Sequence, residues 1–203
     1  VRDLAARLTI WRHPYAAAVA AGVGIGEPDL FRIEAELNRS FAERATLGAR
    51  DGTMALRHHV AELIDGDNIL TALLLVGTAP EWPVEQAFCP GGWRLTPERF
   101  AAAARAPDRH RASVMLAQTI GDQALARRIR RYGATPARLE SALREAQHAA
   151  LAVKARLDPL SEAPLLEYLY RLRGQAERIT MAIWAAAMDA PPATAERLLG
   201  GTS

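Results

Sequence analysis

The sequence ALRHHVAELIDGDNILTALLLV, residues 55–76, predicts one long helix. Apolar side chains recur at helical spacing on both sides of Asp65-Gly66-Asp67, so we expect the helix to continue through a tripeptide that could also form a turn. Asp51 and Thr53 precede it as capping residues. We expect Asp67 to lie on the same face as the apolar stripe. The stripe itself consists of Leu56, Val60, Leu63, Ile64, Leu70 and Leu74.

This helix belongs to a pattern that occurs twice in the chain. Ile33-Glu34 followed by Leu37 corresponds to Leu139-Glu140 followed by Leu143, each early in a predicted helix. A longer helix then carries an acid–polar–Ile triplet, which is Asp67-Asn68-Ile69 in one half and Glu177-Arg178-Ile179 in the other. Repeated helical units usually stack on one another and form a scaffold or a binding surface. The sequence therefore predicts two pseudo-repeats, residues 1–104 and 105–203, each a long-helix hairpin with short connecting helices.

Composition agrees with an all-α fold. Half of the 203 residues are hydrophobic and 24% are charged, which is ordinary for a globular protein. Aromatic residues make up only 6%, and helix-favouring Ala, Leu, Arg and Glu dominate. The formal net charge of +2 gives no support for nucleic-acid binding, the single Cys89 excludes a disulfide framework, and no apolar run is long enough to cross a bilayer.

Other helix boundaries are marked by proline and capping residues. One helix begins near Pro28-Asp29, with Leu30, Ile33, Leu37 and Phe41 at helical spacing. Thr96-Pro97-Glu98 and Thr135-Pro136 are start signals, and the last long helix is expected from about Ala163 to Met188. The apolar face of that last helix is predicted to consist of Leu165, Leu169, Leu172, Ala176, Ile179 and Ile183.

No catalytic constellation emerges from the motifs. Gly22, Gly24 and Gly26 fit neither the Rossmann fingerprint nor the P-loop, so we interpret them as a linker. The histidines His13, His58 and His59 lack a nucleophile or second acid in a recognisable motif. We therefore predict no catalytic residues, no cofactor and no metal.

Two alternatives stay open beside that prediction. His58, Glu62 and Asp65 share one helix face at zinc-compatible spacing, but a solvated surface is the simpler interpretation. A basic cluster could contact nucleic acid, although a solvated face or a contact with an acidic partner protein explains it better. The cluster consists of Arg127, Arg128, Arg130 and Arg131.

The carboxylates of the repeated triplets, Asp67 and Glu177, are predicted to be structural. A buried carboxylate is costly unless it is paired, and Arg173 lies one turn before Glu177. We therefore expect an ion pair there and not a catalytic acid.

Three segments resemble a known family, the C-type subunits of the V/A-type rotary ATPases, whose eukaryotic homologues are the d-type subunits of V-ATPases. Ile64-Asp65 with Asn68-Ile69 and Leu73 resembles the family's "iD-x-x-NI-x-x-x-L" segment. The segment 88–95, FCPGGWRL, resembles the "PGG-x-L" turn, and residues 164–179 resemble the terminal "E-x-x-x-I" helix. Leu74 stands where the family usually has arginine or lysine, and the family has three helical repeats where two are visible here.

The resemblance implies a non-catalytic adaptor with a funnel-like helical fold. Such a protein connects the central stalk to the membrane proteolipid ring and supports ion transport coupled to ATP. The implied partners are the stalk subunits and the ring, with the membrane reached only through them, no nucleic acid, and a cytoplasmic location peripheral to the membrane. The alternative is a helical protein–protein scaffold unrelated to ATP synthesis.

Overall fold

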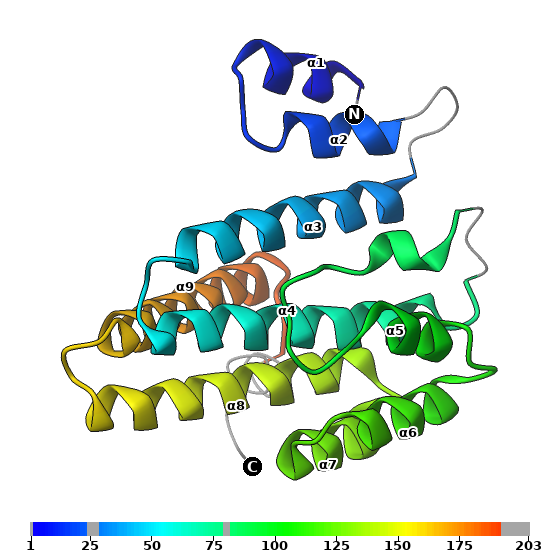
Figure 1. The fold of residues 1–203 in the computed structure, drawn as a ribbon. Coiled ribbons are helices and arrows are strands. Elements are labelled where there is room, and N and C mark those ends of the chain that lie inside the picture. Colours follow the sequence, from blue (N-terminus) through cyan, green and yellow to red (C-terminus); the bar gives the residue numbers. More distant parts are fainter. Residues whose placement is uncertain (1, 24–28, 79–81, 192–203) are drawn as a thin grey trace. The chain divides into compact units, whose positions relative to one another are not determined.

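The computed structural model describes residues 2–23, 29–78 and 82–191 (Figure 1). Within these ranges the regular secondary structure consists of helices, and no strand is present. The all-α prediction is therefore confirmed. The elements in chain order are α1 (Arg2–Ile10), α2 (Ala16–Val23), α3 (Leu30–Ala49), α4 (Met54–Leu75), the 3-10 turn η1 (Val84–Ala87), α5 (Pro97–Ala104), α6 (Arg109–Thr119), α7 (Gln123–Tyr132), α8 (Pro136–Leu157) and α9 (Ala163–Ala187).

The predicted helix starts agree with the structure, and capping side chains hold two of them. Thr53 lies at the N-cap of α4, but its side chain makes no capping hydrogen bond. The Asp29 carboxylate accepts the N–H of Arg32 at the start of α3, and the Thr96 hydroxyl accepts the N–H of Arg99 at the start of α5. α4 runs without a break through Asp65-Gly66-Asp67, which excludes the turn. Gly22 lies in α2 and not in a linker, and Gly24 and Gly26 lie outside the described residues.

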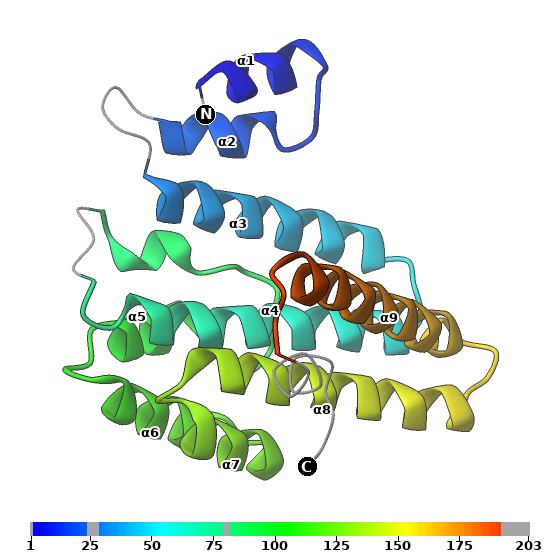
Figure 2. The same ribbon diagram turned by 180° about the vertical axis from the view of Figure 1, so that it is seen from behind.

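Contacts divide the chain into two compact units, Val1–Gln147 and His148–Ser203. This division reflects packing, and the two sequence repeats, residues 1–104 and 105–203, stay a prediction. In the first unit α3 runs beside α4 (Figures 1 and 2). α5 and α6 also pack against α4, and α7 packs against α6. In the second unit His148 on α8 stacks on Tyr170 of α9, with ring centroids 6.1 Å apart.

The main core of the first unit surrounds α4. Ile69, Leu73, Phe100, Ile129 and Leu139 have no exposed surface, and they come from α4, α5, α7 and the first turn of α8. The core face of α4 differs from the predicted one. Its members, spaced at i, i+3, i+4 and i+7, are Ala61, Ile64, Asp65, Asn68, Ile69, Ala72 and Leu73.

The predicted position of the buried face of α4 is therefore wrong: the observed face is rotated from it by part of a helical turn. Leu74 is 41% exposed and Asp67 is exposed, whereas Asp65 is buried. The reason is that two polar residues, Asp65 and Asn68, occupy core positions. A prediction based on apolar spacing alone does not assign polar residues to the core. Leu30 and Phe41 of α3 are also exposed, because α3 buries mainly small side chains such as Ala35 and Ala42.

The large apolar side chains of α9 are mostly exposed. Their sequence spacing places them on one side of the helix, as expected. None of these large side chains is fully buried. The exposed members are Leu165, Leu169, Leu172, Ile179 and Ile183.

Asp29 provides a test of how the start of α3 is held. Its carboxylate also accepts the indole N–H of Trp82 at 2.9 Å, and the hydrogen bond from the Arg32 backbone is the main cause that lowers the pKa of Asp29 below 3.8. We expect Asp29→Ala to reduce the free energy of unfolding at pH 7 by about 1 kcal/mol, since a cap is lost.

Because the folded pKa of Asp29 is depressed, the carboxylate stabilises the fold above pH 3.8 and loses this effect as the pH falls through the folded value. Urea unfolding between pH 6 and pH 2 should show the deficit narrowing, with Asp29→Asn as the control whose smaller deficit does not change with pH. A deficit of Asp29→Ala that is constant over this range would contradict the account.

Candidate functional site

The polar centre of the first unit is Asp65, a carboxylate in the core face of α4. Only 1% of the residue is exposed. Its oxygens accept backbone N–H groups from Trp93 at 3.0 Å, Arg94 at 3.1 Å and Leu95 at 3.3 Å. A buried carboxylate without partners would be unstable, and three charge-assisted hydrogen bonds from one loop satisfy it. Asp65 therefore holds the loop that joins η1 to α5 against α4.

Asn68, one turn along the same face, makes a second attachment. Its Oδ1 accepts the N–H of Cys89 and its Nδ2 donates to the carbonyl of Cys89, both at 2.8 Å. The side-chain amide thus satisfies both backbone groups of one residue. We call residues 89–95, held by Asp65 and Asn68, the clamped loop.

Two glycines allow the clamped loop to approach α4. Gly91 has a φ of +112°, which L side chains rarely adopt, and a Cβ there would lie 2.6 Å from Thr46 Oγ1. A Cβ on Gly92 would lie 2.3 Å from Asp65 Oδ1. Glycine is therefore required at position 92, because the Asp65 carboxylate occupies the space that a Cβ at this position would need.

Side chains at the rim of the loop are engaged as well. The Arg94 guanidinium lies 3.8 Å from Glu62 and 3.6 Å from Asp122, and the His58 ring meets the Trp93 ring edge-on with centroids 4.2 Å apart. His58, Glu62 and Asp65 thus each contact a different part of the clamped loop. The interpretation of this face as solvated is wrong, and nowhere in residues 2–23, 29–78 and 82–191 do three His, Cys, Asp or Glu side chains gather closely enough to hold a metal ion.

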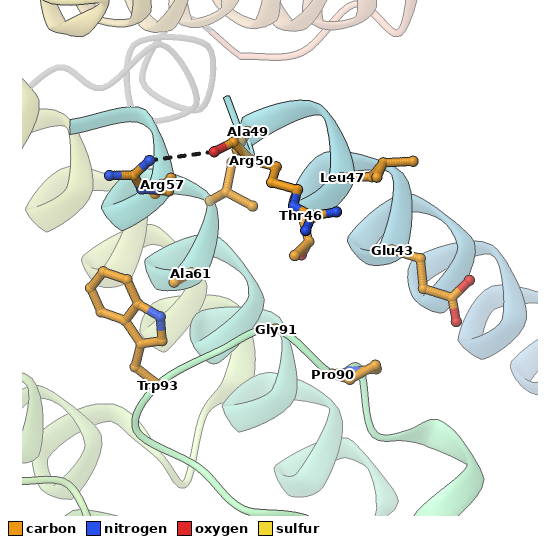
Figure 3. A pocket seen from close by; sticks show the side chains of 11 residues that line it. Glu43, Thr46, Leu47, Ala49, Arg50, Arg57, Ala61, Pro90, Gly91 and Trp93 are labelled. Carbon is orange, nitrogen blue, oxygen red and sulfur yellow. Dashed lines mark hydrogen bonds between the residues drawn. The ribbon is translucent and has the colours of Figure 1, made fainter. Parts of the chain in front are cut away.

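Beside the clamped loop lies an open groove of about 590 Å³ in the first unit. Its walls are the second half of α3, the first half of α4 and the loop at Pro90, Gly91 and Trp93 (Figure 3). Trp93 and Leu47 are 57% and 69% exposed at its edges, and Arg57 donates to the carbonyl of Arg50 at 3.3 Å. The remaining lining residues are Glu43, Thr46, Ala49, Val60 and Ala61. A mainly apolar, open groove of this kind suits contact with another protein surface better than enclosure of a small substrate.

Comparison with known families decides the identity. The sequence profile described as ATP synthase (C/AC39) subunit matches residues 1–198, nearly the whole chain. The chain belongs to the ATP synthase C/AC39 subunit family. No individually curated protein matches it significantly.

Membership of the C/AC39 family agrees with the motifs that suggested it. Two of the segments that carry the resemblance, around Asp65-Asn68 on α4 and Pro90-Gly91-Gly92 in the loop, are the two halves of the clamp. The family is a structural component of V/A-type ATPases and is not itself the catalytic one. Within the described ranges, no helix is both long enough and apolar enough to cross a membrane.

Other candidate groups do not assemble into acid–base chemistry. Burial raises the pKa of the Cys89 thiol to about 11, and the charge of Asp67 contributes, so the thiolate is scarce at neutral pH. His59 is buried in α4, whereas His13 lies in an exposed turn where it accepts the N–H of Tyr15.

The two carboxylates of the repeated triplets have different environments. Glu177 forms the expected ion pair with Arg173, Nε to Oε1 at 2.9 Å, on an exposed part of α9. Asp67 is exposed, so the prediction that it lies on the core face is wrong. The buried carboxylate of that helix is Asp65, two residues earlier. The signal that could have identified it is the i, i+3 pairing of Asp65 with Asn68, followed by a Gly-Gly pair in the next loop.

Replacement of the clamping carboxylate should weaken the fold. Asp65→Asn keeps the shape but removes the charge and turns an NH₂ group toward backbone donors, so we expect the free energy of unfolding to fall by about 3 kcal/mol. Asp51→Asn, at an exposed position, is the matched control and should change it by less than about 0.5 kcal/mol. Chemical denaturation followed by circular dichroism measures both. Equal, small effects of the two substitutions would show that the clamp contributes little.

The close approach at Gly92 gives a second test. Gly92→Ala should cost about 3 kcal/mol, because the methyl group displaces the loop from Asp65. Gly48→Ala is the matched control: a Cβ at Gly48 in α3 meets nothing within 4 Å, so this variant should gain up to about 1 kcal/mol from helix propensity. Unfolding midpoints that move in the same direction for both variants would contradict this account.

Proposed function

We propose that this protein is a non-catalytic adaptor of a rotary V/A-type ATPase, in which it connects the central stalk to the membrane proteolipid ring. The family match over residues 1–198 is the observation that carries the proposal. In this role the protein lies on the cytoplasmic side, peripheral to the membrane, and its contacts support ion transport coupled to ATP.

The geometry of the first unit is consistent with a mechanical part. Its buried polar groups Asp65 and Asn68 are consumed in fixing a loop, which leaves them unable to bind or activate a substrate. A protein that transmits torque must resist local deformation. A loop in which five backbone groups are hydrogen-bonded to two core side chains resists it better than a free loop.

The open groove beside the clamped loop is the proposed contact surface for another ATPase subunit. It presents the exposed side chains of Trp93 and Leu47 on a rigid frame, and exposed aromatic residues often dominate binding energy at protein interfaces. The proposed alternative, a helical scaffold outside the ATPase, would use the same groove for a different partner.

Affinity purification of the full-length protein from its own cells tests the assignment. Stalk subunits and the proteolipid should be identified in the purified complex by mass spectrometry. Trp93→Ala should weaken their recovery about tenfold or more, as expected for a hot-spot residue, and Trp11→Ala is the control because Trp11 is 69% exposed but distant from the clamped loop in the chain. Recovery of other partners without any stalk or ring component would exclude the adaptor and favour the scaffold.

A further inference from the structure

Charge of one sign is concentrated on α6 and α7 in the first unit. The two helices, RHRASVMLAQT and QALARRIRRY, contain six arginines and neither Asp nor Glu. The acids that precede them are engaged elsewhere, since Asp108 caps α6 and Asp122 caps α7 and lies 3.6 Å from Arg94.

Packing brings the arginines of both helices together. α6 and α7 lie side by side (Figure 1), and a Cβ on Gly133, just after α7, would lie 2.4 Å from the Cβ of Ser113 in α6. The start of α6 therefore lies next to the end of α7. We call the resulting surface the arginine face; it consists of Arg111, Arg127, Arg128, Arg130 and Arg131, whereas the Arg109 Nε donates to the carbonyl of Leu73 on α4 at 3.2 Å.

The arginines of α7 differ from many other arginines of this chain in their lack of acidic partners. Arg7, Arg105, Arg144, Arg171 and Arg173 each lie within about 3.2 Å of a carboxylate. Across the part of the chain that the structure describes, the four arginines of α7 have no carboxylate within 4.0 Å. Three of them are exposed and Arg128 is half-buried, while Ala126 and Ile129 turn the opposite side of α7 into the core.

The arginine face also lacks apolar groups. None of the large exposed hydrophobic side chains in the described ranges belongs to α5, α6 or α7, and Tyr132, against which Arg131 packs, is half-buried. The buried centre of a stable protein interface is usually apolar, and binding of single-stranded nucleic acid uses exposed aromatic rings. A surface that offers only guanidinium donors fits a broad, uniformly anionic surface.

We propose that the arginine face binds the anionic phospholipid headgroups of a membrane. This inference rests on the proposed function, because an adaptor peripheral to a membrane has a lipid surface within reach, and it adds a direct contact to the attachment through partner proteins. Each arginine near an anionic surface strengthens binding about fivefold, so the four of α7 together supply roughly several hundredfold. That is enough to orient a protein already held by its partners.

Sedimentation of the purified protein with vesicles tests this directly. At about 50 mM NaCl it should bind vesicles of roughly 70% phosphatidylcholine and 30% phosphatidylserine, and not vesicles of phosphatidylcholine alone. Binding should fall steeply at about 500 mM NaCl as the charges are screened. The variant with Arg127→Gln, Arg128→Gln, Arg130→Gln and Arg131→Gln should lose about a hundredfold or more.

The matched control removes four exposed, paired arginines through Arg7→Gln, Arg105→Gln, Arg171→Gln and Arg173→Gln. Its net charge equals that of the α7 variant, so it should keep most of the binding if the position of the charge matters. Circular dichroism confirms that both variants fold. A triple variant that retains Arg131 replaces the α7 variant if the contact of Arg131 with Tyr132 is needed for stability.

Several outcomes would overturn the proposal. They are failure of the wild type to bind anionic vesicles, equal loss in the two quadruple variants, and stronger binding to duplex DNA than to vesicles at the same salt. Loss of ATPase co-purification by the α7 variant, with vesicle binding unchanged, would assign the arginine face to an acidic partner protein instead. Vesicle binding requires no other part of the ATPase, so its failure leaves the adaptor assignment to be judged by co-purification alone.

Discussion

A charged carboxylate inside a helical core is the constraint on which the first unit depends. The N–H groups in the interior of α4 are used within the helix, so its backbone has no donors to offer Asp65. The donors come from Trp93, Arg94 and Leu95, and they can reach the carboxylate only because Gly92 has no side chain. The burial of one charge thereby determines the path of a loop and the requirement for glycine at position 92.

This arrangement explains how buried residues of the kind that catalysis uses can have a structural role. Asp65 and Asn68 would attract notice in a search for active sites, since both are buried and polar. Every oxygen and the amide nitrogen that they present is used by the clamped loop. As a structural consequence, a fixed loop forms one wall of the open groove, and Trp93 lies at its edge against His58.

Charge is distributed in two distinct ways over the described residues. Several ion pairs are local, such as Arg7 with Asp3 one turn away, and an exposed pair of this kind contributes little to stability. The arginines of α7 are different, since the helix has no acid to pair with them and its neighbour α6 has none either. Like charges on one surface repel one another and destabilise the isolated fold, and they attract a surface of the opposite sign.

The sequence by itself determined the helical class, the main helix boundaries and the family. These follow from local physics: the Asp29 and Thr96 caps and the prolines at helix starts act within one turn of chain, and the family segments are read directly. It also led to the Glu177–Arg173 pair, because both residues lie on one helix four positions apart.

Tertiary structure alone decided which face of α4 is buried and which carboxylate of that helix is structural. The apolar pattern of α4 is nearly continuous from Ile69 to Val76, so periodicity did not distinguish its faces, and Asp67 was assigned to the core in place of Asp65. The partners of Asp65 lie 28 to 30 residues away in an irregular loop. No pattern within one helix predicts such a contact, because it depends on where the chain returns after the helix has ended.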